Sequence, residues 1–449
     1  MRYIPLTPED KDAMLKTIGA KNIGELFEQI PEEFKLKKDL KLPAPLGEME
    51  LSAHMKALSE EGEITLKNIS FLGGGINRHY VPAVIPALLS REEFLTAYTP
   101  YQPEASQGTL QALYEFQTYI AILSGMDVAN ASLYDGATAT AEAALMARRI
   151  NKKGKTVYVS SALHPHYREV LRTYLRDVDV PVVELPFDQK TGKTIYDAEQ
   201  MKDALCLIVG YPNYFGIIEN LDEAKEVATK IGALLISVTT EALSLAILKP
   251  PGEFGVDIFV GEGQSFGLPP SFGGPLLGLM ATKTEHVRNL PGRIIGKGKD
   301  KFGKDAFMIV IATREQHIKR EKATSNICTN EALCALTAVM YLTLYGKTGL
   351  ADLAKINMEN ACALRGAMKG MFKDCISFSG PTFNEFVIRT PLPAKFVLEA
   401  LAQRNIYGGI ALSKDYRRSN PNDILVAVTE MNRLDEVFNF VNALKEVSQ

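Results

Sequence analysis

LCLIVGYPNYFGIIENLDEAKEVATKIGALLISV, residues 205–238, contains two apolar runs on either side of a helix-forming segment. The runs 205–210 and 233–238 have the length of buried strands, and the segment 221–231 between them repeats apolar residues at the spacing of one helix face. Gly232 follows that segment, as a glycine does at the end of many helices. A strand, a helix and a second strand in this order predict two parallel strands joined by a crossover helix.

The same alternation continues on both sides of this stretch. Further strand-like runs lie at 156–160 and 256–260, with helical segments between the strands. The pattern predicts an α/β fold with a mainly parallel sheet and helices on both faces. Beyond it, helices followed by short strands indicate a smaller α/β domain. We therefore expect an N-terminal helical arm (1–65), a large α/β domain (66–320) and a small C-terminal α/β domain (321–449).

Composition excludes several classes of protein. The chain has 449 residues, and 50 Lys and Arg against 53 Asp and Glu give a formal net charge of −3. This balance offers no electrostatic reason to expect nucleic acid or an anionic membrane as a partner. No apolar run reaches the roughly 18 residues of a transmembrane helix, and the N-terminus lacks the apolar core of a signal peptide, so we expect a cytoplasmic protein. The five cysteines show no zinc-site spacing, and we expect no metal.

One segment has the features of a helix N-terminus that binds an anion. Residues 134–149 read YDGATATAEAALMARR, in which Asp135 and Gly136 open a helix rich in small residues. Free backbone N–H groups and the hydroxyls of Thr138 and Thr140 would suit a phosphate. The alternative is that the small residues only allow the helix to pack closely on the sheet.

Two further segments concentrate polar side chains. Residues 71–117 begin with three glycines and then interleave polar and aromatic residues with prolines, as in the walls of ligand sites. Each of these residues taken alone is expected to have a structural role, but their clustering predicts a functional site. The second segment, 313–333, is basic, and its Arg314 belongs either to a solvated face or to a site that binds a carboxylate or closes an interface.

Four stretches of the chain together resemble the glycine cleavage system P-protein, and specifically its N-terminal half, which is a separate chain in many bacteria. They are YTPYQPEASQGTLQALYEFQT (98–118), MDVANASLYDGATATAEA (126–143), GEGQSFGLPPSFGGP (261–275) and TREQHIKREKATSNICTN (313–330). The resemblance implies a fold type I transferase with pyridoxal phosphate (PLP) as the cofactor of the system. It also implies a partner chain, subunit 2, with which this chain decarboxylates glycine and passes the aminomethyl group to the lipoyl arm of the H-protein.

The resemblance further implies that this chain does not anchor the cofactor. In the catalytic half of the family, the lysine that binds PLP lies in a His-Lys-Thr-Phe segment, and Gln264 stands at the position of that lysine. An amide cannot form a Schiff base. Ser237 falls near the position of the acid that keeps the pyridine nitrogen protonated. We therefore expect the lysine of subunit 2 to anchor PLP, and we expect residues 135–140 to be a vestigial phosphate cradle.

This chain is then expected to supply the opposing wall of a shared active site. His79 is the predicted proton carrier because of its intrinsic pKa, and Tyr98 or Tyr101 would bond substrate or cofactor. The other residues expected to contact the substrate or the interface are Asn77, Arg78, Tyr80, Gln102, Ser106, Gln107 and Arg314.

Two alternatives stay open. The chain could be an independent PLP enzyme of another class, which would require a lysine in the loop after residue 260. It could also be a structural or regulatory partner whose residues never approach the substrate.

Overall fold

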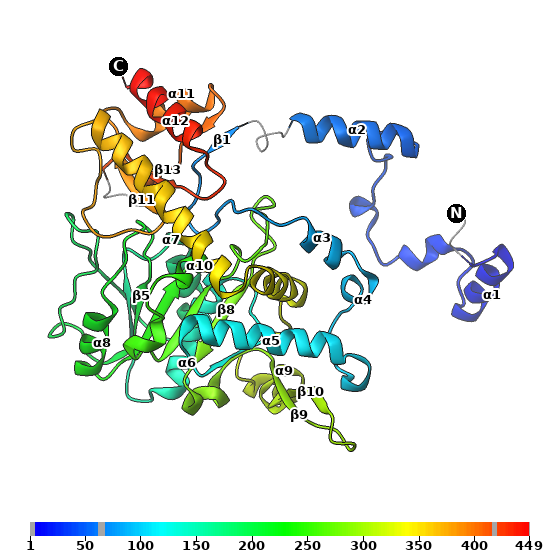
Figure 1. The fold of residues 1–449 in the computed structure, drawn as a ribbon. Helices are drawn as coiled ribbons and strands as arrows, with labels where there is room; N and C mark the ends of the chain where they lie inside the picture. The colour runs from blue at the N-terminus through cyan, green and yellow to red at the C-terminus, as the bar shows by residue number, and fades with distance from the viewer. Residues whose placement is uncertain (1–4, 62–67, 415–419, 449) are drawn as a thin grey trace. The chain divides into compact units, whose positions relative to one another are not determined.

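Seven strands form the central sheet of the computed structural model, in the order β2-β8-β7-β6-β5-β3-β4 (Figure 1). Their bounds are β2 (Val128–Ala129), β3 (Thr156–Ser160), β4 (Val182–Leu185), β5 (Ala204–Gly210), β6 (Leu234–Thr239), β7 (Ile258–Glu262) and β8 (Gly278–Thr282). The strands from β4 to β7 run parallel, whereas β8 is antiparallel to both β7 and β2. The predicted mainly parallel sheet is confirmed. The structure describes all residues except 1–4, 62–67, 415–419 and 449.

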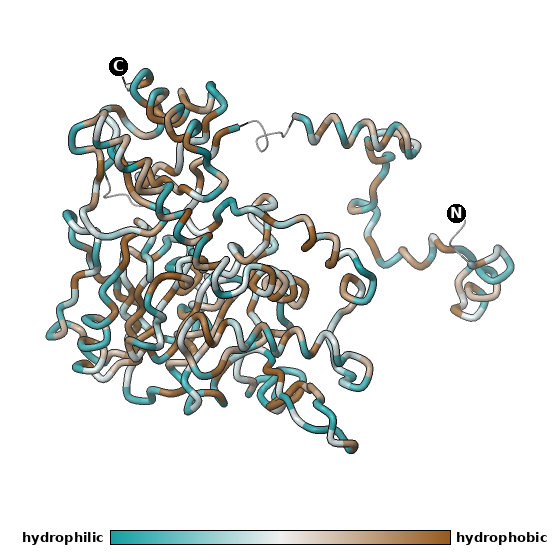
Figure 2. The backbone as a smooth tube through the Cα atoms, in the orientation of Figure 1, coloured by the Kyte–Doolittle hydropathy of each residue, from teal (hydrophilic) through white to brown (hydrophobic). Residues whose placement is uncertain are grey.

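Helices cover both faces of this sheet, because successive apolar residues in each strand point to opposite sides. Ile208, Ile236 and Ile258 pack in the core that contains α6 (Gly136–Ile150) and α7 (Pro165–Arg176). On the other face, strand residues pack against α5 (Gln107–Ser124) and α8 (Leu221–Lys230). Figure 2 shows the apolar residues gathered in these interior strands.

The predicted helix after residue 220 is confirmed in its details. Asn220 caps α8 by accepting the backbone N–H of Glu223, and Gly232 follows the helix with a φ of 68°, where a side chain would be strained. Its buried residues are Leu221 and two alanines on one face. The amphipathic spacing therefore sets which face lies on the sheet.

The C-terminal part contains an antiparallel sheet in the order β11 (Glu385–Arg389), β14 (Asp423–Ala427), β13 (Ile410–Ala411). The helices around it are α10 (Ala332–Met371), α11 (Ala394–Ala402) and α12 (Leu434–Val447). A short strand early in the chain, β1 (Ile69–Ser70), pairs in parallel with β12 (Ile406–Tyr407). The segment that follows the arm therefore packs with the end of the chain.

The helix α10 is the one described helix that is long and apolar enough to cross a membrane by length and composition. Gly346 interrupts it with a φ of 59°. Residues of its first half pack in the core with α5, and residues of its second half pack with the C-terminal sheet. Burial against these elements accounts for its apolar composition.

Shorter elements connect these helices and strands between residues 84 and 414. They are α3 (Val84–Leu89), α4 (Glu92–Leu95), η3 (Pro103–Ala105), η4 (Ala242–Ala246), η5 (Pro251–Phe254), η6 (Thr284–Asn289), β9 (Ile294–Lys299), β10 (Asp305–Val310), η7 (Ala312–Arg314), α9 (Gln316–Lys319), η8 (Arg320–Lys322) and η9 (Leu412–Lys414). The strands β9 and β10 form an antiparallel hairpin.

Contacts divide the chain into two units, Met1–Glu63 and Ile64–Gln449. The first contains α1 (Pro8–Ile18), η1 (Ile23–Phe27), η2 (Glu32–Phe34) and α2 (Glu48–Glu61). None of residues 5–60 is buried. The predicted boundaries at 65 and 320 stay predictions.

Candidate functional site

Gln264 lies two residues after β7 and is 2% exposed. Its side-chain carbonyl accepts the backbone N–H of Asn77 at 2.9 Å, and its amide nitrogen donates to the carbonyl oxygens of Asn77 at 3.0 Å and Leu268 at 2.6 Å. The amide thus satisfies both backbone groups of Asn77. A lysine ammonium has only donors, so it could not accept the Asn77 N–H. We call Gln264, Asn77 and Leu268 the amide clamp.

Glu262, the last residue of β7, occupies the start of α6. It is 1% exposed and accepts three backbone N–H groups, those of Gly136 at 3.0 Å, Gln264 at 3.1 Å and Leu277 at 2.8 Å. Gly136 is the first residue of α6, so a carboxyl group of this chain takes the place that an anion would take at the helix N-terminus. Burial, with a smaller effect of Asp135, raises the pKa of Glu262 to about 8.

The other residues predicted for the phosphate cradle are also used within the chain. Asp135 accepts the Thr138 N–H at 2.7 Å and caps the helix, as the sequence predicts. The Thr138 hydroxyl bonds Asp135, and the Thr140 hydroxyl donates to the Gly136 carbonyl at 2.8 Å. The N-terminus of α6, which the sequence suggested as a phosphate site, is therefore capped by side chains of this chain.

A cavity of about 430 Å³ remains next to this helix start. It is lined by Gly73, Gly74, Gly75, Ile76, Asp135, Ala137, His164, His166, Tyr167, Tyr214, Glu262, Leu276 and Ile410. A side chain at Gly74 would come within 2.9 Å of Ile410, so glycine is needed for this close approach.

The residues of this region do not fit PLP. Ser237 is fully buried, and its hydroxyl has no hydrogen-bond partner in the described part of the chain, so no carboxylate stands there for the pyridine nitrogen. Gln264 offers no amine, and Lys283 beyond the loop pairs with Asp257. With Glu262 at the helix start, the positions that the resemblance assigns to the lysine, the acid and the phosphate hold none of the groups that PLP would need.

A buried charged cluster lies beside the amide clamp. His79 is 6% exposed, and its Nδ1 lies 3.0 Å from Oε2 of Glu430 while its Nε2 lies 3.1 Å from Oε2 of Glu241. Burial would lower the pKa of His79, but the charges and hydrogen bonds of the two carboxylates outweigh it and raise the pKa to about 10. Asn77 Nδ2 also donates to Glu241, at 2.7 Å.

This geometry leaves His79 without a ring nitrogen for a substrate, because both are engaged with carboxylates. Its predicted role as a proton carrier stays a prediction that these contacts do not favour. The cluster instead joins three regions of the chain, since Glu241 follows β6 and Glu430 follows β14. Sequence reasoning missed both glutamates. The position of Glu241 after a parallel strand was an available signal, because polar residues there gather at one sheet edge.

The predicted residues around 98–107 form a separate group. Tyr98 is 80% exposed, and the Tyr101 hydroxyl accepts a hydrogen bond from Arg293 at 3.1 Å. Gln102 is exposed, and Ser106 precedes α5. The Gln107 amide exchanges hydrogen bonds with the backbone of Phe307. Among the described residues, no hydrogen bond joins Tyr98 or Tyr101 to residues 73–80.

Three predicted residues remain, Arg78, Tyr80 and Arg314, and hydrogen bonds within the chain hold Arg78 and Arg314. The Arg78 carbonyl accepts the Thr429 hydroxyl at 2.7 Å, and Tyr80 is 52% exposed. Arg314 is 9% exposed and donates to the carbonyls of Ile311 and Gly292.

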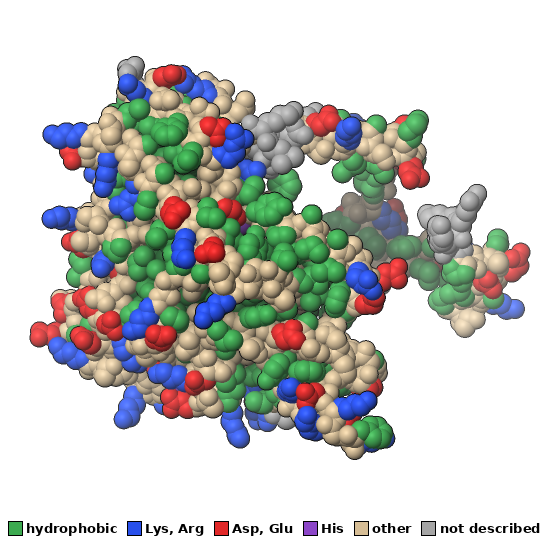
Figure 3. Space-filling view, in the orientation of Figure 1, with side chains coloured by type: hydrophobic (Ala, Val, Ile, Leu, Met, Phe, Trp, Pro, Cys, Tyr) green, Lys and Arg blue, Asp and Glu red, His purple; other side chains and the backbone are tan. Residues whose placement is uncertain are grey.

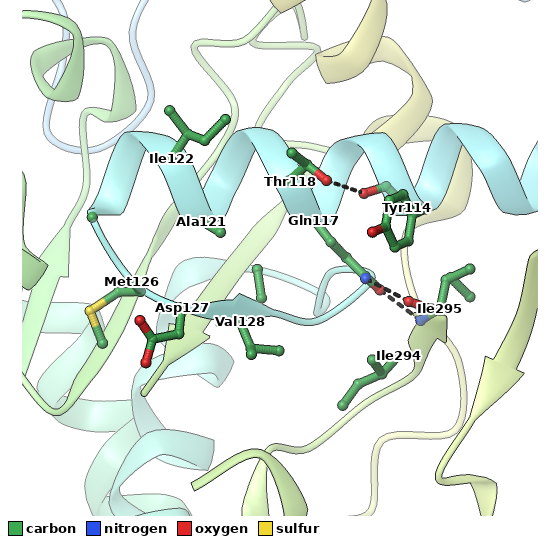
Figure 4. Close-up of a pocket in the computed structure, with 12 residues that line it drawn as sticks. Tyr114, Gln117, Thr118, Ala121, Ile122, Met126, Asp127, Val128, Ile294 and Ile295 are labelled. Atoms are coloured by element: carbon green, nitrogen blue, oxygen red, sulfur yellow. Dashed lines mark hydrogen bonds between the residues drawn. The ribbon is translucent and has the colours of Figure 1, made fainter. Parts of the chain in front are cut away.

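A larger hollow, of about 580 Å³, lies between α5 and the strands β2 and β9 (Figure 4). Gln117 exchanges two hydrogen bonds with the backbone of Ile295 on its wall. Its one carboxylate, Asp127, accepts the Thr284 N–H at 2.9 Å. These polar groups hold the wall together, so this hollow offers less for chemistry than the cavity beside Glu262.

Comparisons with known proteins agree along the whole chain. The family model for the glycine cleavage system P-protein matches residues 1–444. The probable glycine dehydrogenase (decarboxylating) subunit 1 of Anaeromyxobacter dehalogenans is 47% identical over 449 residues, covering 99% of this chain and 100% of the relative. The protein of the same description from Desulfotalea psychrophila is 43% identical over 446 residues, covering 99% of both.

Solved structures show the same fold. An inhibitor-bound crystal structure of glycine decarboxylase (P-protein) of the glycine cleavage system superposes with a TM-score of 0.89 at 41% identity, covering 100% of both chains. Sphingosine-1-phosphate lyase of Burkholderia pseudomallei reaches 0.64 at 15% identity, covering 92% of both chains, which indicates a shared fold only.

Proposed function

The chain belongs to the glycine cleavage system P-protein family, and on this premise we propose that it is the subunit of a glycine decarboxylase that completes the active site without anchoring the cofactor. In this proposal PLP is held by a lysine of a second subunit, the substrate is glycine, and the lipoylated H-protein receives the aminomethyl group.

The amide clamp is the observation that carries this proposal. The side-chain amide of Gln264 is hydrogen-bonded to Asn77 and Leu268, and Glu262 occupies the N-terminus of α6, where a phosphate would bind. With these groups engaged inside the chain, PLP would have to be held by another chain. When bound, PLP supplies an electron sink. The same features argue against an independent PLP enzyme of another class.

The need for a partner is supported by exposed apolar side chains. In the unit Met1–Glu63 they include Phe27, Phe34 and Leu42, the last two more than 70% exposed. A segment of this length with no buried described residue gains little by folding alone, so it needs a further surface to pack on, and we propose that subunit 2 supplies it. The relatives' description as subunit 1 implies that a second subunit exists for them.

A second apolar surface lies on the other unit. Figure 3 shows apolar side chains gathered over α3 and α10. Exposed residues of these helices include Val84, Leu88, Leu333 and Leu344. We propose that subunit 2 covers this face.

The exposed polar residues are then placed for contacts across the interface. Tyr98 and Tyr101 are 80% and 58% exposed, and Tyr80 is 52% exposed. We propose that they orient glycine or the lipoyl arm and help to exclude water from the shared site. His79 and Asn77 would hold the backbone next to Tyr80 in place from inside.

The proposal is tested by glycine-dependent CO2 release with PLP and lipoylated H-protein. The chain alone, the second subunit alone and the mixture are compared. Activity confined to the mixture is the expected result. Activity of this chain alone would contradict the proposal, because it would require an anchoring lysine that the described interior does not provide.

The structural or regulatory alternative is separated by variants. Tyr101→Phe and Tyr98→Phe each remove one hydroxyl, and Gln403→Leu, at an exposed position, is the control. We expect lower activity from at least one tyrosine variant with an intact complex. Unchanged kcat and KM in both would favour a scaffold role.

A further inference from the structure

A hollow of about 460 Å³ lies near the hairpin β9–β10 and is unusually rich in cations. Its lining consists of Arg288, Ile311, Arg314, Lys319, Lys322 and Thr324, and we call it the basic pocket. Four of these six residues are cationic and none is acidic. It shares no residue with the cavity beside Glu262.

The cations of the basic pocket lack direct ion pairs among the described residues. In the described part of the protein, none of its four cations forms a salt bridge within 4.0 Å, although many surface lysines and arginines elsewhere do. Two acids adjoin pocket residues in the sequence, Glu315 next to Arg314 and Glu321 next to Lys322. The carboxylate of Glu315 lies 3.9 Å from Arg293 and 3.7 Å from His317. That carboxylate therefore faces Arg293 and the imidazole of His317 as well as acting on Arg314.

Arg314 distinguishes this pocket from an ordinary solvated face. It is nine-tenths buried, and its side chain donates hydrogen bonds to two neutral carbonyls, those of Ile311 at 3.2 Å and Gly292 at 2.9 Å. Burial lowers the pKa of Arg314, and it lowers that of Arg149 to about 10, with the charge of Arg314 adding to the effect. The charge of Glu315 offsets part of this effect at Arg314, but no carboxylate pairs with the guanidinium within 4.0 Å among the described residues. A buried cation without a direct ion pair is costly, so an anionic ligand would relieve the site.

Two strained residues flank the basic pocket. Ile311 has a φ of 56° and a ψ of 28°, which is an outlier for a β-branched side chain. Arg320 has a φ of 52° and a ψ of −121°. The Ile311 carbonyl is also a partner of Arg314, so this strained turn helps to place the guanidinium. Backbone strain of this kind concentrates where a ligand must be held.

We propose that the basic pocket binds the phosphate group of a small phosphate-bearing ligand. A phosphate group offers several acceptor oxygens and up to two negative charges. It therefore suits two arginines, two lysines and the Thr324 hydroxyl better than a single carboxylate does. The hollow is larger than one phosphate, which leaves room for an organic body. The proposal does not depend on the function proposed above.

The test is calorimetric titration of the full chain with inorganic phosphate at constant ionic strength. Glycerol 2-phosphate is titrated in parallel as a monoester, and acetate as a monocarboxylate. We expect saturable binding of phosphate or of the monoester, and weaker binding of acetate. Tighter binding of the monoester would identify an organic phosphate as the source, and equal binding would identify free phosphate. Acetate binding as tight as that of the phosphate compounds, or saturable binding of neither phosphate nor the monoester, overturns the proposal.

Matched variants locate the binding. Arg314→Gln is expected to weaken phosphate binding about tenfold and Lys322→Gln about threefold. Lys230→Gln, an exposed lysine on α8, removes the same charge elsewhere and is expected to leave binding unchanged. Equal weakening by Lys230→Gln would mean that general charge accounts for the affinity, and it would contradict the site. Because Lys322 is exposed, its variant keeps the test decisive if Arg314→Gln does not fold.

Discussion

Replacing Gln264 with leucine tests whether the amide clamp holds the glycine-rich segment. The substitution removes three hydrogen bonds, to the N–H and carbonyl of Asn77 and to the carbonyl of Leu268. Each buried group left without a partner costs about 1–3 kcal/mol, and the low end applies if water enters. Because leucine is close to glutamine in volume, cavity effects add little. We therefore expect a local destabilisation of about 3 kcal/mol.

Hydrogen exchange is the suitable assay, because a chain of two units is not expected to unfold in one step. The Asn77 amide is protected by the Gln264 carbonyl, so its exchange reports the clamp directly. A loss of about 3 kcal/mol corresponds to an exchange rate about 100-fold faster in peptides that cover residues 73–80. Gln403→Leu, at an exposed position, is expected to leave exchange unchanged. A Gln264→Leu chain whose Asn77 amide exchanges at the wild-type rate would refute the reasoning.

Three further predictions concern the charged cluster, the cofactor and the arm. His79→Asn leaves Glu241 and Glu430 without their cation and should cost about 3–5 kcal/mol. Because folding raises the pKa of His79 from 6.5 to about 10, its stabilisation is complete below pH 6.5 and is lost as pH rises through about 10. Thermal unfolding below and above this pH range should show that the difference in stability between wild type and variant becomes smaller as pH rises. A difference in stability that does not depend on pH would count against the charged pair. Gln264→Lys should not create a cofactor-linked absorption band with added PLP, since Glu262 still closes the helix start; such a band would show that our fit argument fails. Phe34→Ser, at a side chain 74% exposed, should change stability by less than about 0.5 kcal/mol. It should weaken association with subunit 2 in sedimentation, and undiminished association would remove the role proposed for the arm.

Local patterns in the sequence predicted much of the fold. The apolar spacing of 221–231 predicted α8 and its buried face, and Asp135 predicted the start of α6. These features depend on residues within one or two helical turns, so they can be read from the chain directly. The sequence could not show in the same way that Glu262 fills the N-terminus of α6, because Glu262 is 126 residues away from Gly136 in the chain.

The sequence by itself determined that the chain is an α/β protein, and its resemblance to a known family predicted that Gln264 stands where the catalytic half of that family has a lysine. Only the tertiary structure decided what that glutamine does and which groups surround His79. The partners of His79 are 162 and 351 residues away in the chain, and Asn77 is 187 residues from Gln264. Hydrogen bonds and charges act over a few ångströms, so contacts between such distant residues are set by how strands and helices pack. Periodicity within a segment contains no information about them.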